Sequence, residues 1–328
     1  MEKLKIIIIH GNFDLDTNLS DIGLREWKDP YKQLYYNYGW KFETPNDIEK
    51  HIDNFNDYLV TKYGKSPDFM LFYESHDKYL ALKDNLNCKK GIIITDIHHS
   101  SRISRIRKNI YENIDAIFTA YGYCFNDFYP TINSSKVISY PAAVHEDFIV
   151  PFNQNPVSKI ILSGVITDEF YRLRCQLYSF HDKYDIDVLK HPSYRSDDYS
   201  NKIVGDRYIK KLNEYLVGFS AEPNKETKRR YFVNKSVEIS AAGCLLLLGI
   251  ETDQFKKDIE EFGFIDGINY ISTVKENMED KIKYVLNHEN RPEIDRIRLN
   301  GYNLVLQKHL VKHRAKLIED TVNNLLNN

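Results

Sequence analysis

The residues best suited to chemistry lie in one stretch, KRRYFVNKSVEISAAGCLLLLGI, residues 228–250. Lys235 and Glu238 are three positions apart in a segment whose pattern predicts a short helix, so they share one helix face. Lys before Glu is the poorer order for a helix-stabilising ion pair. A carboxylate in this place can accept hydrogen bonds from the two vicinal hydroxyls of a ribose, which a lysine cannot do. The stretch therefore predicts a ligand site, with Ala242 and Gly243 letting a flat ligand approach the backbone.

Polar or small residues also follow three of the predicted strands. They are Gly11 and Asn12 after the first strand, Asp96 and His98 after the third, and Ser163 and Gly164 after the sixth. In an open parallel α/β sheet, ligands bind beyond the carboxyl ends of the strands. A single glycine there would indicate no more than a turn. Three such ends together predict a cleft.

The elements that must position these residues alternate along the chain, with short apolar runs followed by longer helical patterns. This alternation is typical of parallel sheets covered by helices on both faces. Strands are predicted at residues 4–9, 69–73, 91–95, 116–118 and 137–139, with helices over 46–63 and 100–111. After prolines 141, 151 and 156 the pattern restarts, with strands at 159–162, 185–189, 215–219 and 244–248 and helices over 168–181 and most of 291–326. We therefore expect two consecutive doubly wound, Rossmann-like domains, residues 1–152 and 153–310.

Length, charge and cysteine content limit the class of protein. The 328 residues suffice for two domains of about 150 residues each. A formal charge of −2 argues against nucleic acid or an anionic membrane as partner, because both need a strong basic excess. Four scattered cysteines without a C-x-x-C pair indicate a reducing, cytoplasmic setting. No apolar run approaches the roughly 20 residues of a membrane-spanning helix, and the N-terminal isoleucine run is too short for a secretory signal.

Metal sites and nucleotide-binding loops of other kinds are weakly indicated. Two D-x-D tripeptides, Asp14 to Asp16 and Asp185 to Asp187, have the oxygen ligands that hard divalent cations prefer, but both fit surface acids better. His309 and His313 are four apart without a third ligand. Neither G-x-G-x-x-G nor G-x-x-x-x-G-K-[ST] occurs. We expect no metal and no cofactor.

The order of motifs in the C-terminal half resembles a known family, the bacterial spore-maturation type of group 1 glycosyltransferases, which have the GT-B fold. The motifs are Ser163-Gly164, Tyr171-Arg172, Lys235-Ser236-Val237-Glu238, Ala241-Ala242-Gly243-Cys244, Leu286-Asn287-His288-Glu289, Gly301, His309 and Arg314. Residues 159–320 carry the resemblance well. The N-terminal half carries it loosely, through Asp96-x-His98 and Pro141-Ala142-Ala143-Val144.

The resemblance implies two Rossmann-like domains that face each other across a cleft, with the last helix, 311–328, packing back on the N-terminal domain. It places the donor nucleotide sugar at Gly164, Arg172, Lys235, Glu238, Ala242 and Gly243. Glu238 would hold the ribose, while Arg172 and Lys235 would stabilise the departing diphosphate. Asp96 and His98 would act next to the transferred sugar, and Gly11 and Asn12 would lie on the acceptor side.

The sequence thus predicts a metal-independent glycosyltransferase that moves a hexose or pentose from a nucleoside diphosphate sugar, UDP-sugars before GDP-sugars, to a hydroxyl of a glycan or related acceptor. A retaining outcome is expected. Many retaining GT-B enzymes, however, have another glutamate eight positions before the one that corresponds to Glu238. In this sequence that position is Arg230. A noncatalytic GT-B protein that binds a nucleotide or glycan is the alternative. The sequence indicates no oligomeric state.

Overall fold

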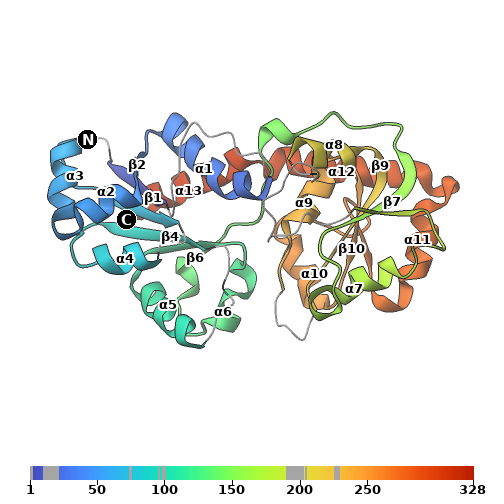
Figure 1. Cartoon of the computed structure of the whole chain (residues 1–328), viewed down its shortest axis with the longest axis horizontal. Coiled ribbons are helices and arrows are strands. Elements are labelled where there is room, and N and C mark those ends of the chain that lie inside the picture. The colour runs from blue at the N-terminus through green and yellow to red at the C-terminus, as the bar shows by residue number, and fades with distance from the viewer. Residues whose placement is uncertain are drawn as a thin grey trace. The chain divides into compact units, whose positions relative to one another are not determined.

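The computed structural model describes residues 3–9, 22–73, 76–94, 97, 101–189, 203, 205–224 and 230–328. The chain forms two compact units, each built around its own parallel sheet (Figure 1). The first contains the opening strand, Lys28–Pro141 and Lys312–Asn328, and the second contains residues 22–27 and Ala142–Val311. Two doubly wound α/β domains, the predicted fold class, are confirmed.

The first sheet has six strands in the order β2-β1-β3-β4-β5-β6, all parallel. The strands are β1 (Lys5–Ile9), β2 (Lys41–Glu43), β3 (Phe69–Tyr73), β4 (Lys89–Ile94), β5 (Ala116–Thr119) and β6 (Val137–Ser139). The helices of this half of the chain are α1 (Ile22–Tyr38), α2 (Pro45–Lys50), α3 (Phe55–Tyr63), α4 (His76–Leu82), α5 (Ser101–Asn113) and α6 (Phe125–Phe128). The central strands are almost wholly apolar, as expected for a sheet covered on both faces.

The second sheet has five parallel strands in the order β11-β10-β9-β7-β8. They are β7 (Val157–Ser163), β8 (Ile186–Leu189), β9 (Tyr215–Ala221), β10 (Leu245–Gly249) and β11 (Ile271–Thr273). The helices are α7 (Asp168–Tyr178), α8 (Asp206–Asn213), α9 (Asn234–Ala241), α10 (Asp253–Glu260), α11 (Met278–Leu286) and α12 (Arg291–Lys308). The strand order reverses between β7 and β9, which is the point where doubly wound sheets bind ligands.

Apolar packing fixes the helices of the second unit on its sheet. Leu173 and Leu177 of α7 join Ile282 of α11 and strand residues such as Phe219 in one buried cluster. On β9, Gly218 lets α9 come close, because a Cβ atom there would lie 2.7 Å from Ile239 Cγ2. The second half of α9 therefore packs closely on the middle of β9.

The predicted helix over residues 46–63 is two helices. Thr44 begins α2 with a capping box, in which its side chain accepts from the Asp47 N–H. The helix ends at His51, and α3 starts at Phe55 after a 3-10 turn over Ile52–Asn54. This turn contains Asp and Asn, which are poor helix formers. The sequence pattern predicts neither the short strands β2 and β11 nor helix α1.

The passage between the units lies earlier than the predicted boundary after residue 152. Residues 142–152 belong to the second unit, because Val144 pairs with the end of α12. The Val144 N–H donates to the His309 carbonyl at 2.9 Å, and the Val311 N–H donates to the Val144 carbonyl at 3.1 Å. Helix α13 (Val311–Asn327) then runs almost wholly within the first unit. None of the helices in the described ranges is long and apolar enough to cross a bilayer.

Candidate active site

The candidate site is at the carboxyl edge of the second sheet, where the strand order reverses. Gly164 follows β7, Glu222 follows β9, and Glu251 follows β10. The first turns of α7, α8 and α9 lie at the same edge, because each of these helices leads back to the amino end of the next strand. Their side chains can therefore meet the residues that follow the strands.

Gly164 is the place where two cations converge. A Cβ atom at this position would lie 2.9 Å from Lys235 Cε and 3.1 Å from Arg174 Nη1. The residue also has φ +99°, which only glycine adopts without strain. The Arg174 guanidinium is buried, lies 3.7 Å from the centroid of the Tyr171 ring, and donates to the Val165 carbonyl at 3.3 Å. The glycine thus makes room for two positive side chains at one point.

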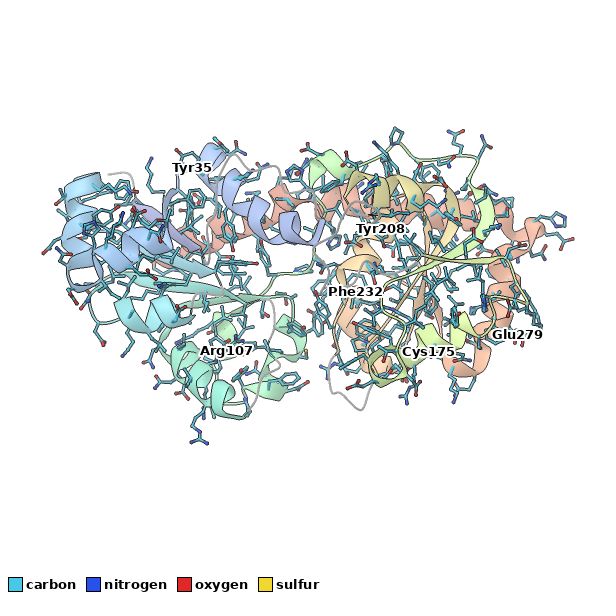
Figure 2. The ribbon with its side chains drawn as sticks, viewed as in Figure 1. Tyr35, Arg107, Cys175, Tyr208, Phe232 and Glu279 are labelled. Carbon is cyan, nitrogen blue, oxygen red and sulfur yellow. The ribbon has the colours of Figure 1, made fainter. Side chains whose placement is uncertain are left out.

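Lys235 lies in the first turn of α9 and is held from α8. Its Nζ donates to the Tyr208 hydroxyl at 2.8 Å and lies 4.8 Å from the Tyr208 ring centroid. Figure 2 labels Tyr208 in the second unit. Glu238, one turn along, is buried, and its Oε2 is 3.9 Å from Nζ. Burial acts to lower the pKa of Lys235, but Tyr208 and the Glu238 carboxylate outweigh it, so the pKa is raised. Lys235 therefore carries its charge at neutral pH.

Arg172 has a different environment from Arg174. Its Nε and Nη2 donate to both carboxylate oxygens of Glu251, at 2.9 Å and 2.7 Å. The backbone N–H of Glu251 in turn donates to the buried Glu222 carboxylate at 2.7 Å, as does the Thr252 N–H at 3.0 Å. Burial raises the pKa of Glu222 to about 7. The charge of Arg172 is thus compensated within the protein.

A break in α7 lies directly before the two arginines, at Tyr171. Tyr171 has φ −142° and ψ 63°, outside the helical range. The side chain of Asn224 enters the helix here: its Oδ1 accepts from the Arg172 N–H at 2.8 Å, and its Nδ2 donates to the Asp168 and Glu169 carbonyls. A side chain inserted into the helical hydrogen bonds is an established cause of a kink. Asn224 thereby sets where both arginines point.

Comparison with known proteins relates this arrangement to a fold. Residues 168–320 match the model of a family described as glycosyl transferase-like. A glycosyltransferase from Rickettsia africae ESF-5 has a TM-score of 0.64 at 12% identity, and the match covers 100% of both chains. HepE from Anabaena, solved in complex with UDP-glucose, has a TM-score of 0.60 at 10% identity, covering 98% of this chain and 100% of its own. The fold is GT-B.

One further GT-B neighbour contains both a nucleotide and a sugar derivative. A mutant of TarM from S. aureus, in complex with Fondaparinux, alpha-GlcNAc-glycerol and UDP, has a TM-score of 0.51 at 12% identity. The match covers 79% of this chain and 55% of that one. No curated protein matches the sequence. The predicted resemblance to a glycosyltransferase family is thus supported in the C-terminal half, while the spore-maturation subtype stays a prediction.

Within this GT-B fold, Ala242 and Gly243 are not near Lys235. They end α9 at the amino edge of the sheet, where β10 begins. Gly243, at φ +75°, ends the helix. Its N–H donates to the Ser240 carbonyl, and the Cys244 N–H donates to the Ile239 carbonyl. Its carbonyl accepts from Arg298 Nε at 2.9 Å. The predicted approach of a flat ligand to Ala242 and Gly243 is replaced by a helix cap, since an eight-residue helix separates them from the site.

The other predicted residues have mixed outcomes. Gly11, Asn12, Asp96 and His98 lie outside the described residues and stay predictions. Asp187, of the second D-x-D, is near the amino end of β8, where it accepts from Lys159 and Tyr215. His309 is buried and its Nε2 lies 2.8 Å from the Phe262 carbonyl. Over the ranges that the structure describes, no group of three or more His, Cys, Asp or Glu side chains could hold a metal ion.

Three of the residues around Gly164 and Lys235 are not part of the site that the sequence predicts: Arg174, Tyr208 and Ser163. Arg174 is two positions after the arginine of the motif, and a regular helix would point the two apart without indicating which one faces the ligand. Tyr208 is one of 24 tyrosines and stands in no motif. For Ser163, the sequence indicates no role beyond its place before Gly164.

Proposed function

We propose that this protein is a glycosyltransferase that moves a sugar from a nucleoside diphosphate sugar to a hydroxyl of a glycan or related acceptor. The observation that carries the proposal is the meeting of Lys235 and Arg174 at Gly164, beside the buried Glu238. The family match over residues 168–320 and the GT-B fold support it. The N-terminal half of the chain would supply the acceptor side, with Gly11 and Asn12.

The chemistry requires fixed positive charge. When the bond from the sugar to the diphosphate breaks, the leaving group gains negative charge, and preorganised cations in a site shielded from water stabilise it strongly. Lys235 and Arg174 are suited to this role. We therefore propose that Arg174, and not the predicted Arg172, stabilises the departing diphosphate together with Lys235. Glu238 would accept hydrogen bonds from the two ribose hydroxyls. His98 and Asp96 remain our candidates beside the transferred sugar.

The donor we propose is a UDP-sugar, and the reaction would need no metal because the two cations neutralise the diphosphate. HepE in complex with UDP-glucose and TarM in complex with UDP support the choice of base. The transferred sugar would be a hexose or pentose. TarM, solved with alpha-GlcNAc-glycerol, supports a glycan or related acceptor.

The stereochemical outcome depends on a position that differs from many retaining enzymes. Arg230, where they have a glutamate, donates through Nε to the buried Asp258 at 2.6 Å. This residue cannot accept hydrogen bonds from a donor sugar. A retaining reaction therefore has to hold the sugar by other groups, and this observation favours the noncatalytic nucleotide-binding protein as the second candidate.

Release of nucleoside diphosphate separates the two candidates. The purified protein is incubated with UDP-glucose, UDP-GlcNAc, UDP-galactose, UDP-xylose and GDP-mannose, with and without EDTA, and free diphosphate is measured. We expect slow hydrolysis of at least one UDP-sugar, unchanged by EDTA. Binding of UDP without release from any donor would support the noncatalytic candidate. Activity lost in EDTA and restored by Mn²⁺ would contradict metal independence.

A further inference from the structure

We infer that Tyr208, together with Ser163, is a positioning residue that holds the ammonium group of Lys235 in place for an anionic ligand at Gly164. The inference rests on the proposed function. It assigns a role in the nucleotide site to a tyrosine on α8 that no sequence motif indicates. Three observations carry it: a chain of hydrogen bonds, its direction, and the donors that it leaves available.

The chain joins three elements of the second unit. Ser163 ends β7, Tyr208 is in the first turn of α8, and Lys235 is in the first turn of α9. The Tyr208 hydroxyl lies 2.8 Å from Lys235 Nζ and 2.9 Å from Ser163 Oγ. Tyr208 is 9% exposed and Ser163 is 2% exposed. Burial raises the pKa of Tyr208, so its hydroxyl stays protonated at neutral pH.

The direction of the chain follows from the chemistry of lysine. An ammonium group has only donors, so the Tyr208 oxygen must accept from Lys235. The proton of the Tyr208 hydroxyl can then be donated to the Ser163 oxygen, 2.9 Å away, which is the remaining partner of this hydroxyl within the described residues. Tyr208 is thereby held from β7 while it holds Lys235. Phenylalanine would keep the ring against the ammonium but would lose both hydrogen bonds.

The remaining donors of Lys235 are available beside Gly164. Within the described residues the ammonium makes one hydrogen bond, to Tyr208, and the Glu238 carboxylate at 3.9 Å is too far for a second. A lysine in the first turn of a helix is also unfavourable for the helix dipole. A flexible side chain that is fixed before the ligand arrives loses less entropy on binding. Tyr208 supplies this fixation.

The test measures UDP binding by calorimetry in the full-length protein, from pH 7 to pH 10. Tyr208→Phe removes the hydroxyl, Ser163→Ala removes the second link, and Lys235→Ala removes the cation. Tyr215→Phe is the matched control, because Tyr215 donates to Asp187 away from the site. We expect about tenfold weaker UDP binding in Tyr208→Phe, and a smaller loss in Ser163→Ala.

The pH dependence distinguishes positioning from a general structural role. Three titratable or charged side chains surround Lys235. They are Tyr208 of α8, Arg174 of α7, and Glu238 of the same helix as Lys235. Without the tyrosine oxygen the pKa of Lys235 falls, so UDP affinity in Tyr208→Phe should decline at lower pH than in the wild type. Ser163→Ala should shift the same way, and the double variant should bind about as Tyr208→Phe does.

The outcomes separate this inference from the proposed function. If neither the wild type nor Lys235→Ala binds UDP, the proposed function fails. If the wild type binds and Lys235→Ala does not, but Tyr208→Phe binds with wild-type affinity and pH dependence, the positioning role is wrong. If Tyr208→Phe unfolds, Ser163→Ala decides: unchanged affinity and pH dependence in that variant overturn the inference.

Discussion

Arg172 and Arg174 are two positions apart on α7, yet their guanidinium groups have different partners. Arg172 makes a bidentate ion pair with Glu251, whereas Arg174 lies beside Gly164 and Lys235. An anion at Gly164 would meet the charge of Arg174 directly. For Arg172, the same anion would have to compete with a carboxylate already in place.

Alanine substitutions should show this difference. Arg174→Ala is expected to weaken UDP binding by about tenfold or more, since a hydrogen bond to a charged group contributes about 1.5 to 3 kcal/mol. Arg172→Ala, the matched control, should weaken it less. Calorimetric titration with UDP measures both. Equal losses, or a larger loss in Arg172→Ala, would return the diphosphate role to Arg172.

Gly164→Ala tests the space that the two cations need. The added Cβ would crowd Lys235 Cε at 2.9 Å and Arg174 Nη1 at 3.1 Å. Gly267→Ala is the control, because Gly267 has a similar φ of +73° but no atom within 4 Å of its Cβ position. Both variants should lose about 1 kcal/mol of stability to backbone strain. Only Gly164→Ala should lose UDP binding, and a loss in both would show that strain alone is responsible.

Glu222 should make stability depend on pH. Its pKa is raised from 4.5 to about 7 in the folded protein, so between these values the folded state holds a proton that the unfolded state has lost. The free energy of unfolding contributed by this group is therefore lost as pH rises from about 4.5 to 7, by about 3 kcal/mol. Urea denaturation of the wild type and Glu222→Gln at pH 5 and pH 7.5 measures it. Parallel pH dependence in both proteins would contradict the shift.

At the scale of elements, the break in α7 depends on a residue that follows β9. The Asn224 side chain hydrogen-bonds one backbone N–H and two backbone carbonyls of α7 beside the break. These bonds connect the strand end that bears Glu222 to the helix that bears both arginines. The geometry of the site is therefore a property of two elements together.

Asn224→Ala should lower both stability and ligand binding. The three backbone groups lose their partners, which we expect to lower the free energy of unfolding by about 2 kcal/mol or more, and the arginines lose their fixed direction. Asn213→Ala is the matched control, since Asn213 donates to the Pro151 and Ala242 carbonyls at the amino edge. Chemical denaturation and UDP titration separate the two effects. Weakened UDP binding in Asn213→Ala as well would indicate that instability alone is the cause.

At the scale of the whole molecule, the last helix completes the first unit. Glu319 of α13 accepts from Lys5 of β1 at 2.5 Å and from the Trp40 ring N–H at 2.6 Å, in a buried environment. Arg314 of the same helix donates to the Pro141 carbonyl at 2.6 Å. Burial lowers the pKa of Arg314 to about 10. The first and last parts of the chain thus depend on each other for stability.

Glu319→Ala should therefore destabilise the first unit strongly. The Lys5 ammonium, 8% exposed as a residue, would stay buried, and among the described residues it would keep Asn323 and the Trp40 ring as partners. Removing one member of a buried ion pair costs about 3 to 5 kcal/mol. Asp320→Ala is the control, because its pair with Lys316 is exposed and should matter by less than about 1 kcal/mol. Urea denaturation followed by tryptophan fluorescence measures both, and similar midpoints for the two variants would contradict the expectation.

The sequence alone determined most strands of both sheets and the class of fold, because hydrophobic periodicity is a local property. Strands β3 and β6 begin and end where the pattern predicts, and Lys235 and Glu238 share a helix face as their spacing requires. Gly164 was placed at a strand end for the same reason. Each of these follows from neighbours within a few residues.

Only the tertiary structure decided which side chains meet. Whether Arg172 or Arg174 faces Gly164 depends on Asn224, which is about 50 residues later in the chain, and the partner of Lys235 comes from another helix. Gly243 looked like part of the site because it follows Glu238 closely, yet a helix carries it to the opposite edge of the sheet. Such contacts depend on how distant segments pack, and spacing along one segment does not contain that information.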